Sequence, residues 1–122
     1  MNIKGVDMGY YSFFEFKIKD ATIDINKAKE IEKQFTDINN ANVYGFWGVS
    51  FHTDNNGKLL DIKLREYYAK FYDDELFVDE LQNALITGEI YLYFIGEDGT
   101  KWGYRVEPGK VVPLCNVWVP CE

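Results

Sequence analysis

The sequence predicts a single α+β domain over residues 1–122, in which an antiparallel-rich sheet of five to six strands carries two helices on one face. Alternating apolar and polar residues surround two Asx-Gly turn signals, and two other segments repeat apolar residues at helical spacing. The expected order is strand, helix, two strands, helix and two or three strands. It resembles a ferredoxin-like βαββαβ arrangement with extra C-terminal strands. Residues 1–8 are expected to form a disordered or extended lead.

The first expected strand follows this lead. From Tyr10 to Lys19, apolar and polar side chains alternate, as they do in a strand that is buried on one side only. The buried side is expected to carry Tyr10, Ser12, Phe14, Phe16 and Ile18, and the solvent side Glu15, Lys17 and Lys19.

The first helix is predicted from apolar residues that recur every three or four positions. Asp24 or Asn26 is the expected N-cap, and Asn39-Asn40 marks the expected end. The buried stripe of this helix is expected to contain Ala28, Ile31, Phe35 and Ile38.

A hairpin is predicted next, because Asn56-Gly57 is typical of a two-residue type I′ turn. Pairing about that turn brings the apolar residues of the two strands together on one face. The expected apolar pairs are Thr53 with Leu60, Phe51 with Ile62 and Val49 with Leu64, and the pairs on the other face are His52 with Asp61 and Ser50 with Lys63.

The second helix is predicted to begin at Asp73 or Asp74, either of which can act as the N-cap. Asp74 and Glu75 then lie near the positive end of the helix dipole. Gly88 is expected to end the helix as its C′ residue. Its buried stripe is expected to contain Phe77, Leu81, Ala84 and Leu85.

The segment from Glu89 to Val106 is the hairpin around which the predicted sheet is organised. Asp98-Gly99 predicts another two-residue type I′ turn. One face of the hairpin would then be aromatic and the other largely aliphatic. The expected pairs on the aromatic face are Ile95 with Trp102, Tyr93 with Tyr104 and Tyr91 with Val106, and the other face would carry Ile90, Leu92 and Phe94.

The C-terminal segment begins with a predicted type II turn at Pro108-Gly109 and continues as a strand that could reach Val119. Pro113 indicates that this strand lies at an edge or stops early. A disulfide between Cys115 and Cys121 would close only a short loop, so we expect reduced thiols.

Charge and hydropathy argue against several classes of function. The net charge of −7 argues against direct nucleic-acid binding, but it permits a basic protein partner or mimicry of nucleic acid. No apolar run approaches the ~20 residues of a membrane span, and the start shows no signal-peptide pattern. We therefore expect a cytoplasmic protein that does not enter a membrane.

No residue set predicts catalysis, a cofactor or a metal. His52 lies opposite Asp61 in the predicted hairpin, as a general base would, yet no nucleophile is predicted beside it. Glu75 and Asp79 lie four residues apart on a helix, but capping and solvation account for both. Nucleotide-binding glycine motifs are absent, and two cysteines with one histidine make no zinc signature. The expected catalytic, cofactor and metal residues are therefore none.

The high aromatic content is the remaining indication of function. Aromatic residues form 17% of the chain, more than one modest core buries with every polar tip satisfied. Tyrosine and tryptophan also anchor protein interfaces. The candidate interaction residues are Tyr67, Tyr68, Tyr91, Tyr93, Trp102 and Tyr104, with the acidic Asp73, Asp74 and Glu75.

Three functions remain open on this basis. The first is a non-catalytic domain that binds a protein partner, or a second copy of itself, through an aromatic face rimmed with acid. The second is an inhibitor of the phage type that mimics nucleic acid through acidic helix faces. The third is an enzyme or small-ligand binder with a pocket between sheet and helices near His52.

Three short motifs resemble a loose family of small uncharacterised phage and bacterial proteins. They are Met8-Gly9-Tyr10-Tyr11, Lys70-Phe71-Tyr72-Asp73, and Gly96-Glu97-Asp98-Gly99 followed by Trp102. The resemblance extends from Met8 to Val112, and residues 2–7 and the cysteine-bearing tail lie outside it. It implies a mobile-element origin and brings no catalytic residue with it.

Overall fold

The computed structural model describes residues 11–36, 46, 48–69, 71, 74–115 and 119–121. These residues form two helices, a six-stranded antiparallel sheet and a separate two-stranded sheet, so the predicted α+β class is confirmed. The elements in chain order are β2 (Ser12–Ile23), α1 (Ile25–Thr36), β3 (Ser50–Thr53), β4 (Leu59–Lys63), β5 (Tyr68–Ala69), α2 (Asp74–Ala84), β6 (Leu85–Gly96), β7 (Lys101–Glu107), β8 (Lys110–Cys115) and β9 (Val119–Pro120).

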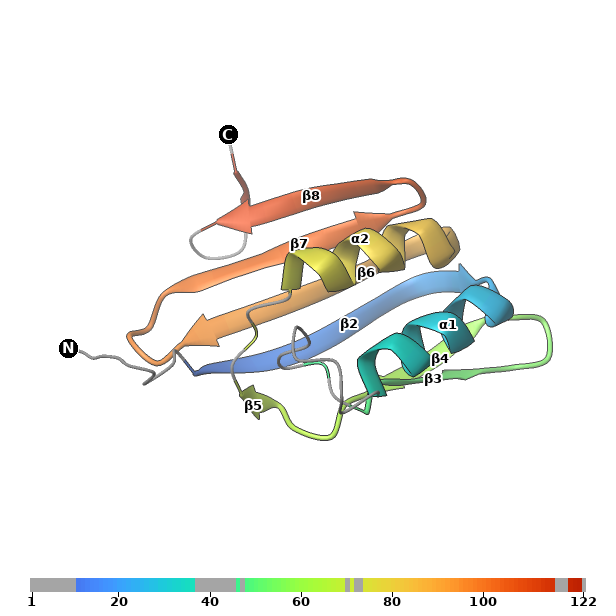
Figure 1. Cartoon of the computed structure of the whole chain (residues 1–122). Coiled ribbons are helices and arrows are strands. Elements are labelled where there is room, and N and C mark those ends of the chain that lie inside the picture. Colours follow the sequence, from blue (N-terminus) through green and yellow to red (C-terminus); the bar gives the residue numbers. More distant parts are fainter. Residues whose placement is uncertain are drawn as a thin grey trace.

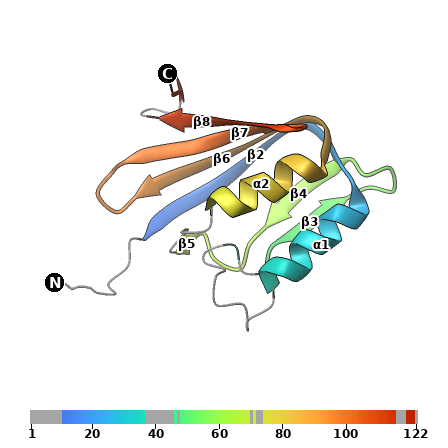
Figure 2. The same ribbon diagram turned by 45° about the horizontal axis from the view of Figure 1, so that its top comes forward.

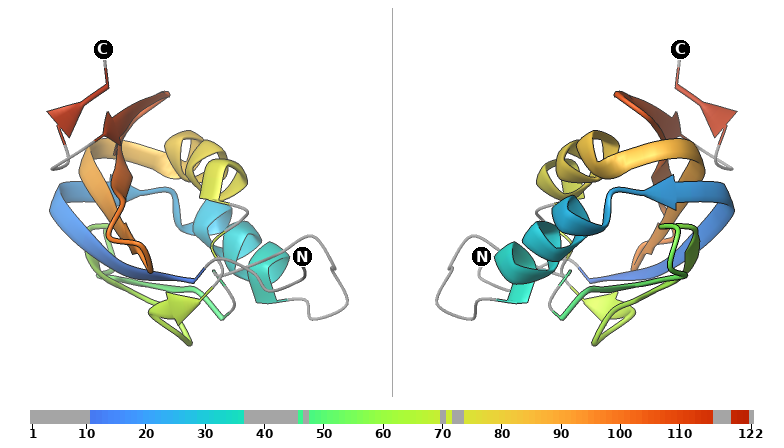
Figure 3. Two further views of the ribbon diagram at one scale, coloured as in Figure 1. Left: turned by 90° about the vertical axis from the view of Figure 1, so that its left-hand side faces the viewer. Right: turned by 90° about the vertical axis from the view of Figure 1, so that its right-hand side faces the viewer.

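The large sheet has the strand order β5-β2-β6-β7-β8-β9, and its two outermost strands are only two residues long. Helix α2 lies over this sheet at β7 and β8, and α1 lies next to α2 over the β3–β4 hairpin (Figures 1 and 2). Views from the two sides place both helices on the same side of the sheet, as predicted (Figure 3). We call the opposite face, on which no described helix lies, the helix-free face.

The β3–β4 hairpin forms its own two-stranded sheet. It meets β2 through an isolated bridge between Thr22 and Lys58 and a hydrogen bond from the Ile23 N–H to the Gly57 carbonyl (2.9 Å). Near the other end of β2, the Phe14 N–H donates to the Tyr67 carbonyl (2.9 Å). The predicted ferredoxin-like topology, which would place the hairpin strands in the main sheet, is not confirmed.

The core begins with the pairing of β2 and β6, whose inward residues face each other directly. Phe14 pairs with Phe94, and the next two inward pairs are aromatic–aliphatic and aliphatic–aliphatic. The polar side chains Glu15, Lys17 and Lys19 are exposed on the helix-free face. The alternation predicted for the first strand is therefore confirmed from Ser12 onward, and Tyr10 lies outside the described residues.

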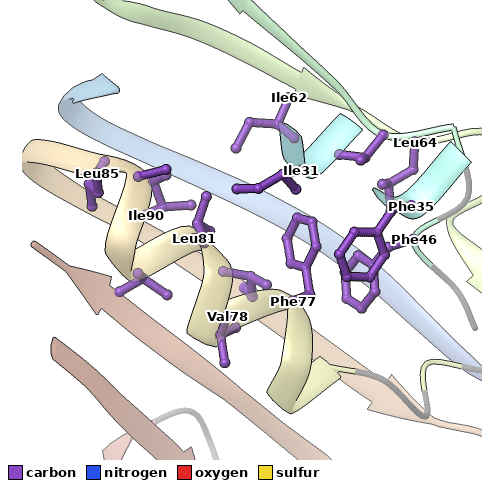
Figure 4. Close-up of a cluster of buried hydrophobic side chains, with 14 of the residues drawn as sticks. Ile31, Phe35, Phe46, Ile62, Leu64, Phe77, Val78, Leu81, Leu85 and Ile90 are labelled. Carbon is purple, nitrogen blue, oxygen red and sulfur yellow. The ribbon is translucent and has the colours of Figure 1, made fainter. Parts of the chain in front are cut away.

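Phenylalanine rings connect the helices to the sheet. Phe46 stacks on Phe77 of α2 with ring centroids 4.1 Å apart, and Phe35 of α1 meets Phe77 edge-on at 5.2 Å. All three side chains are fully buried. Figure 4 shows them beside Ile31 and Leu81, which extend the same cluster between the two helices. Ring packing of this kind favours one relative placement of the two helices on the sheet.

Helix α1 begins after Asp24, whose Oδ1 accepts a hydrogen bond from the Lys27 N–H (3.0 Å). Asp24 is therefore the N-cap, and Asn26 is not. Ala28, Ile31 and Phe35 are buried as predicted. The prediction for Ile38 and the predicted stop at Asn39-Asn40 lie outside the described residues.

Helix α2 buries the predicted Phe77, Leu81 and Ala84, but the prediction for its end was wrong. The helix stops at Ala84, and the buried Leu85 already belongs to β6. Gly88 lies inside that strand with a φ of +81°. A Cβ there would collide with the Asp20 carbonyl, so this glycine allows close approach of β2 and does not cap the helix.

The β6–β7 hairpin has a register one residue away from the predicted one. Gly99 has a φ of +86°, but Asp98 has no positive φ, so a type I′ turn is not formed. Instead the Gly96 N–H donates to the Thr100 carbonyl (2.8 Å), which makes a three-residue loop. Asp98 Oδ1 accepts from the Thr100 N–H (3.0 Å) and stabilises that loop. The observed pairs include Phe94 with Trp102, Leu92 with Tyr104, Tyr93 with Gly103 and Tyr91 with Arg105.

The predicted aromatic face of this hairpin is therefore wrong. Trp102 and Tyr104 lie on the helix-covered face, beside Phe94. Tyr91 and Tyr93 lie on the helix-free face, because side chains of adjacent residues point to opposite sides.

The β3–β4 hairpin uses the same kind of three-residue loop. The Asp54 N–H donates to the Lys58 carbonyl (3.0 Å), and Gly57 has a φ of +84°. Thr53 consequently pairs with Leu59 and not with Leu60. The extra residue Leu60 then restores the predicted register as a bulge. The confirmed pairs are His52 with Asp61, Phe51 with Ile62 and Ser50 with Lys63, while no pairing of Val49 with Leu64 is observed within β3 and β4.

The C-terminal segment turns at Pro108-Gly109 as predicted, since Glu107 pairs with Lys110 and Gly109 has a φ of +71°. β8 ends at Cys115, short of the Val119 that the sequence allowed. The expectation of reduced thiols is wrong, because Cys115 and Cys121 form a disulfide. The strand β9 pairs with β8, and this pairing brings the Cα atoms of the two cysteines to 5.1 Å from each other. That distance is within the usual range for a disulfide.

The first prediction concerns Gly103, where a Cβ would collide with the Leu92 carbonyl oxygen of the neighbouring strand. Gly103→Ala should lower the free energy of unfolding by about 3 kcal/mol, because backbone rather than a flexible side chain must move. Gly99→Asn is the control, since nothing lies within 4 Å of a Cβ there and asparagine tolerates positive φ. Urea denaturation measures both. Equal stability of Gly103→Ala and wild type would contradict the observed register.

Candidate functional site

The residues predicted to form one interaction face divide between the two faces of the sheet. Tyr68, Tyr91 and Tyr93 lie on the helix-free face, whereas Trp102 and Tyr104 lie beneath α2 on the covered one. Glu75 is exposed on α2, and Asp73 lies outside the described residues. Tyr67 is exposed, but its hydroxyl accepts a hydrogen bond from the Leu64 N–H (3.1 Å) and holds the turn before β5.

An aromatic patch made of Tyr11, Phe13 and Tyr68 lies at one corner of the helix-free face. Phe13 pairs across the strands with Tyr68 of β5, and their ring centroids are 4.5 Å apart. Tyr11 stacks on Tyr68 at 5.2 Å. Phe13 is 58% exposed, Tyr68 44% and Tyr11 37%. Large rings this exposed are characteristic of binding surfaces when they are contiguous.

Sequence reasoning missed Tyr11 and Phe13. The signal was present in the alternation of the first strand, because Phe13 falls on the same face as Glu15, Lys17 and Lys19. An aromatic ring on the charged face of a half-buried strand departs from the expected pattern. Such a departure indicates a residue that serves something other than the core.

The middle of the helix-free face carries Tyr91 and Tyr93, whose rings stack 5.9 Å apart. The Tyr91 hydroxyl donates to Glu89 Oε1 (3.0 Å), and partial burial together with this bond raises its pKa. Arg105 Nε lies 2.9 Å from Glu107 Oε2 and 3.9 Å from Glu89 Oε2. These ion pairs neutralise the guanidinium, whereas Lys17 and Lys19 of β2 stay exposed opposite Tyr91 and Glu89.

Asp74 connects the N-terminus of α2 to the covered face of the sheet. Its Oδ2 accepts hydrogen bonds from the Tyr104 hydroxyl (2.8 Å) and the Trp102 Nε1–H (3.2 Å). Its Oδ1 accepts from the Glu75 N–H (2.9 Å). Trp102 also stacks on Phe94, with ring centroids 5.1 Å apart. Three of the predicted interaction residues therefore hold the helix on the sheet.

The electrostatics of this cluster follow from its burial. Burial raises the pKa of Asp74 above its ordinary 3.8, and its three hydrogen bonds oppose that shift without cancelling it. Burial and the Asp74 charge both raise the pKa of Tyr104 far above its usual value. Tyr104 therefore stays a hydrogen-bond donor across the physiological range.

His52 is exposed on β3, opposite Asp61. Its Nε2 lies 3.0 Å from the Ser50 hydroxyl, a neighbour that the sequence had not indicated. A hollow among the described residues lies elsewhere, between β2 and β6, and His52 does not line it. Within the described part of the chain, no group of three or more His, Cys, Asp or Glu side chains could hold a metal ion.

Neither described helix is long and apolar enough to cross a membrane. Comparisons with known protein families, with curated proteins and with solved structures find no match to this chain.

The second prediction concerns pH. Folded Asp74 holds its proton more tightly than the unfolded chain does, so its contribution to stability is greatest below pH 3.8 and is lost as pH rises through the raised pKa. The asparagine of the Asp74→Asn variant cannot ionise, so the variant does not lose stability in this way as pH rises. The melting temperature of the variant relative to wild type should therefore rise between pH 4 and pH 7, as measured by circular dichroism. A difference that stays constant, or falls, over that range would contradict the raised pKa.

Proposed function

We propose that this chain is a non-catalytic acidic domain that binds a protein partner, or a second copy of itself, through the aromatic patch on its helix-free face. The observation that carries the proposal is the 58% exposure of Phe13 in direct contact with Tyr68. Burying such rings against a partner is favourable, and aromatic side chains dominate the energetics of protein interfaces. The net charge of −7 favours a basic partner, which it would attract at long range.

Mimicry of nucleic acid has less support from the surface. The second helix carries Glu75 and Asp79 toward solvent, but the first exposes Lys29 and Lys33 beside it. Cations on the neighbouring helix weaken the negative field that an enzyme groove for nucleic acid would recognise. An enzyme with a pocket near His52 also has less support, because the described hollow lies away from that residue.

Other predictions stay predictions. The likeness to phage and bacterial proteins and the ferredoxin-like relationship are two of these. A cytoplasmic location is a third, and the disulfide between Cys115 and Cys121 weighs against it, since such bonds are rare in that compartment.

The third prediction tests the patch. The tagged full chain is used to capture partners from extracts of the organism that encodes it, and its own oligomeric state is followed by light scattering. Phe13→Ser with Tyr68→Ser should weaken the captured complex, or the self-association, roughly 30-fold or more, as loss of hot-spot residues does. The fold should survive, because both side chains lie on the surface and neither belongs to the buried core.

Leu60→Ser is the matched control. Leu60 is 61% exposed, but it lies in β4 beside Lys58, which bridges to Thr22 at the far end of β2. This variant should retain the complex. Retention by the Phe13/Tyr68 double variant, or equal loss with Leu60→Ser, would contradict the proposal.

A further inference from the structure

A hollow of about 210 Å³ lies next to the aromatic patch, on the helix-free face between β2 and β6. Pockets that enclose small-molecule ligands measure roughly 300–1,000 Å³, so this one is small for a cofactor or metabolite. It has room for one side chain of a partner. Its described lining residues are Phe13, Phe14, Glu15, Tyr93 and Ile95.

The walls of the hollow combine apolar surface with one carboxylate. Phe13 pairs with Ile95 across the two strands, and Glu15 pairs with Tyr93. Glu15 is the one charged residue among the described lining residues. No ion pair joins its carboxylate to a described lysine or arginine within 4.0 Å. An aromatic wall beside an unneutralised carboxylate is suited to a cation.

The charge of Glu15 acts inside the hollow. Burial raises the pKa of Tyr93 most, and the negative charge of the Glu15 carboxylate raises it further. The Glu15 charge therefore acts on the tyrosine that forms the opposite wall. Lys17 follows on the same face of β2, and Lys101 pairs with Ile95 from β7. Lys17 therefore lies in the neighbouring row of the sheet and Lys101 in the same row as Phe13 and Ile95, but neither lines the hollow.

Arginine fits these walls better than lysine. Its planar guanidinium can stack on an aromatic ring and at the same time donate two hydrogen bonds to one carboxylate. The ammonium of lysine is a compact, strongly hydrated charge that gains less from a ring face. A guest with a phosphate would instead meet the Glu15 carboxylate at close range and be repelled.

We propose that the hollow binds an arginine side chain of the protein partner, with the guanidinium stacked between the Phe13 and Tyr93 rings and paired with the Glu15 carboxylate. The inference rests on the proposed function and identifies the residue type that anchors the partner.

The test is a nuclear magnetic resonance titration of the labelled full chain with acetyl-Gly-Arg-Gly-amide. The resonances of Phe13, Glu15, Tyr93 and Ile95 should shift and saturate with a Kd of roughly 1–10 mM, as expected for one small anchor. The matching citrulline peptide has the same shape without the charge, and it should bind about fivefold more weakly or not at all. The lysine peptide should fall between the two.

Glu15→Gln should weaken binding of the arginine peptide by about fivefold, since the substitution removes the charge and keeps the shape of the side chain. Glu30→Gln, on the exposed side of α1, removes the same charge elsewhere and should leave binding unchanged. Resonance shifts with the citrulline peptide as large as those with the arginine peptide would overturn the inference. Unchanged affinity of the arginine peptide for Glu15→Gln would do the same. So would saturable binding of an oligothymidylate at these resonances without any response to the arginine peptide.

The capture experiment separates this inference from the proposed function. Weaker capture of the partner by Glu15→Gln (about fivefold) and by the Phe13/Tyr68 double variant (roughly 30-fold or more) supports both. Weaker capture by the double variant alone supports the proposed binding surface and rejects the arginine site. Retention of the partner by both variants rejects both.

Discussion

The antiparallel pairing of β2 with β6 is the constraint on which the rest of this structure depends. Both strands are twelve residues long, and their regular pairing from Ser12 to Lys19 assigns the side chains there to one of two faces. Phe14 and Phe94 meet on the face that α1 and α2 cover, and Phe13 and Ile95 meet on the other. A slip of one residue would exchange the two sets, so the covered face and the helix-free face are specified together.

The two faces use their aromatic residues in different ways. On the covered face, Trp102 and Tyr104 direct their polar atoms to Asp74, so that one carboxylate joins the start of α2 to β7. This arrangement satisfies buried donors that would otherwise be costly. On the helix-free face the rings of Phe13 and Tyr68 meet each other and solvent. The same sheet therefore carries a packed core on one side and, on the other, the exposed aromatic surface that we propose binds a partner.

The sequence pattern predicted the helices and strands well, but it predicted the register of the hairpins less well. Strand alternation and helical spacing are local properties. The structure confirms the alternation of β2, the cap at Asp24 and the described part of both helical stripes except Leu85, which belongs to β6. Hairpin register is less local, because an Asx-Gly pair fits both a two-residue and a three-residue loop. In the β3–β4 hairpin the bulge at Leu60 compensates for the longer loop, whereas β7 has no such bulge after Gly99. The wrong register assigned Trp102 to the face that holds Tyr91 and Tyr93. Phe13 was missed because the candidate aromatic residues were limited to tyrosine and tryptophan.

Cross-strand proton contacts between β6 and β7 test this assignment of faces most directly. The hydrogen bond from Gly96 to Thr100 fixes which pairs lack hydrogen bonds, and the Hα atoms approach each other most closely in those pairs. The structure predicts strong Hα–Hα nuclear Overhauser effects between Tyr93 and Gly103 and between Tyr91 and Arg105. An Hα–Hα effect between Phe94 and Gly103 in their place would show the other register. It would put Trp102 on the helix-free face and contradict the division of aromatic residues described above.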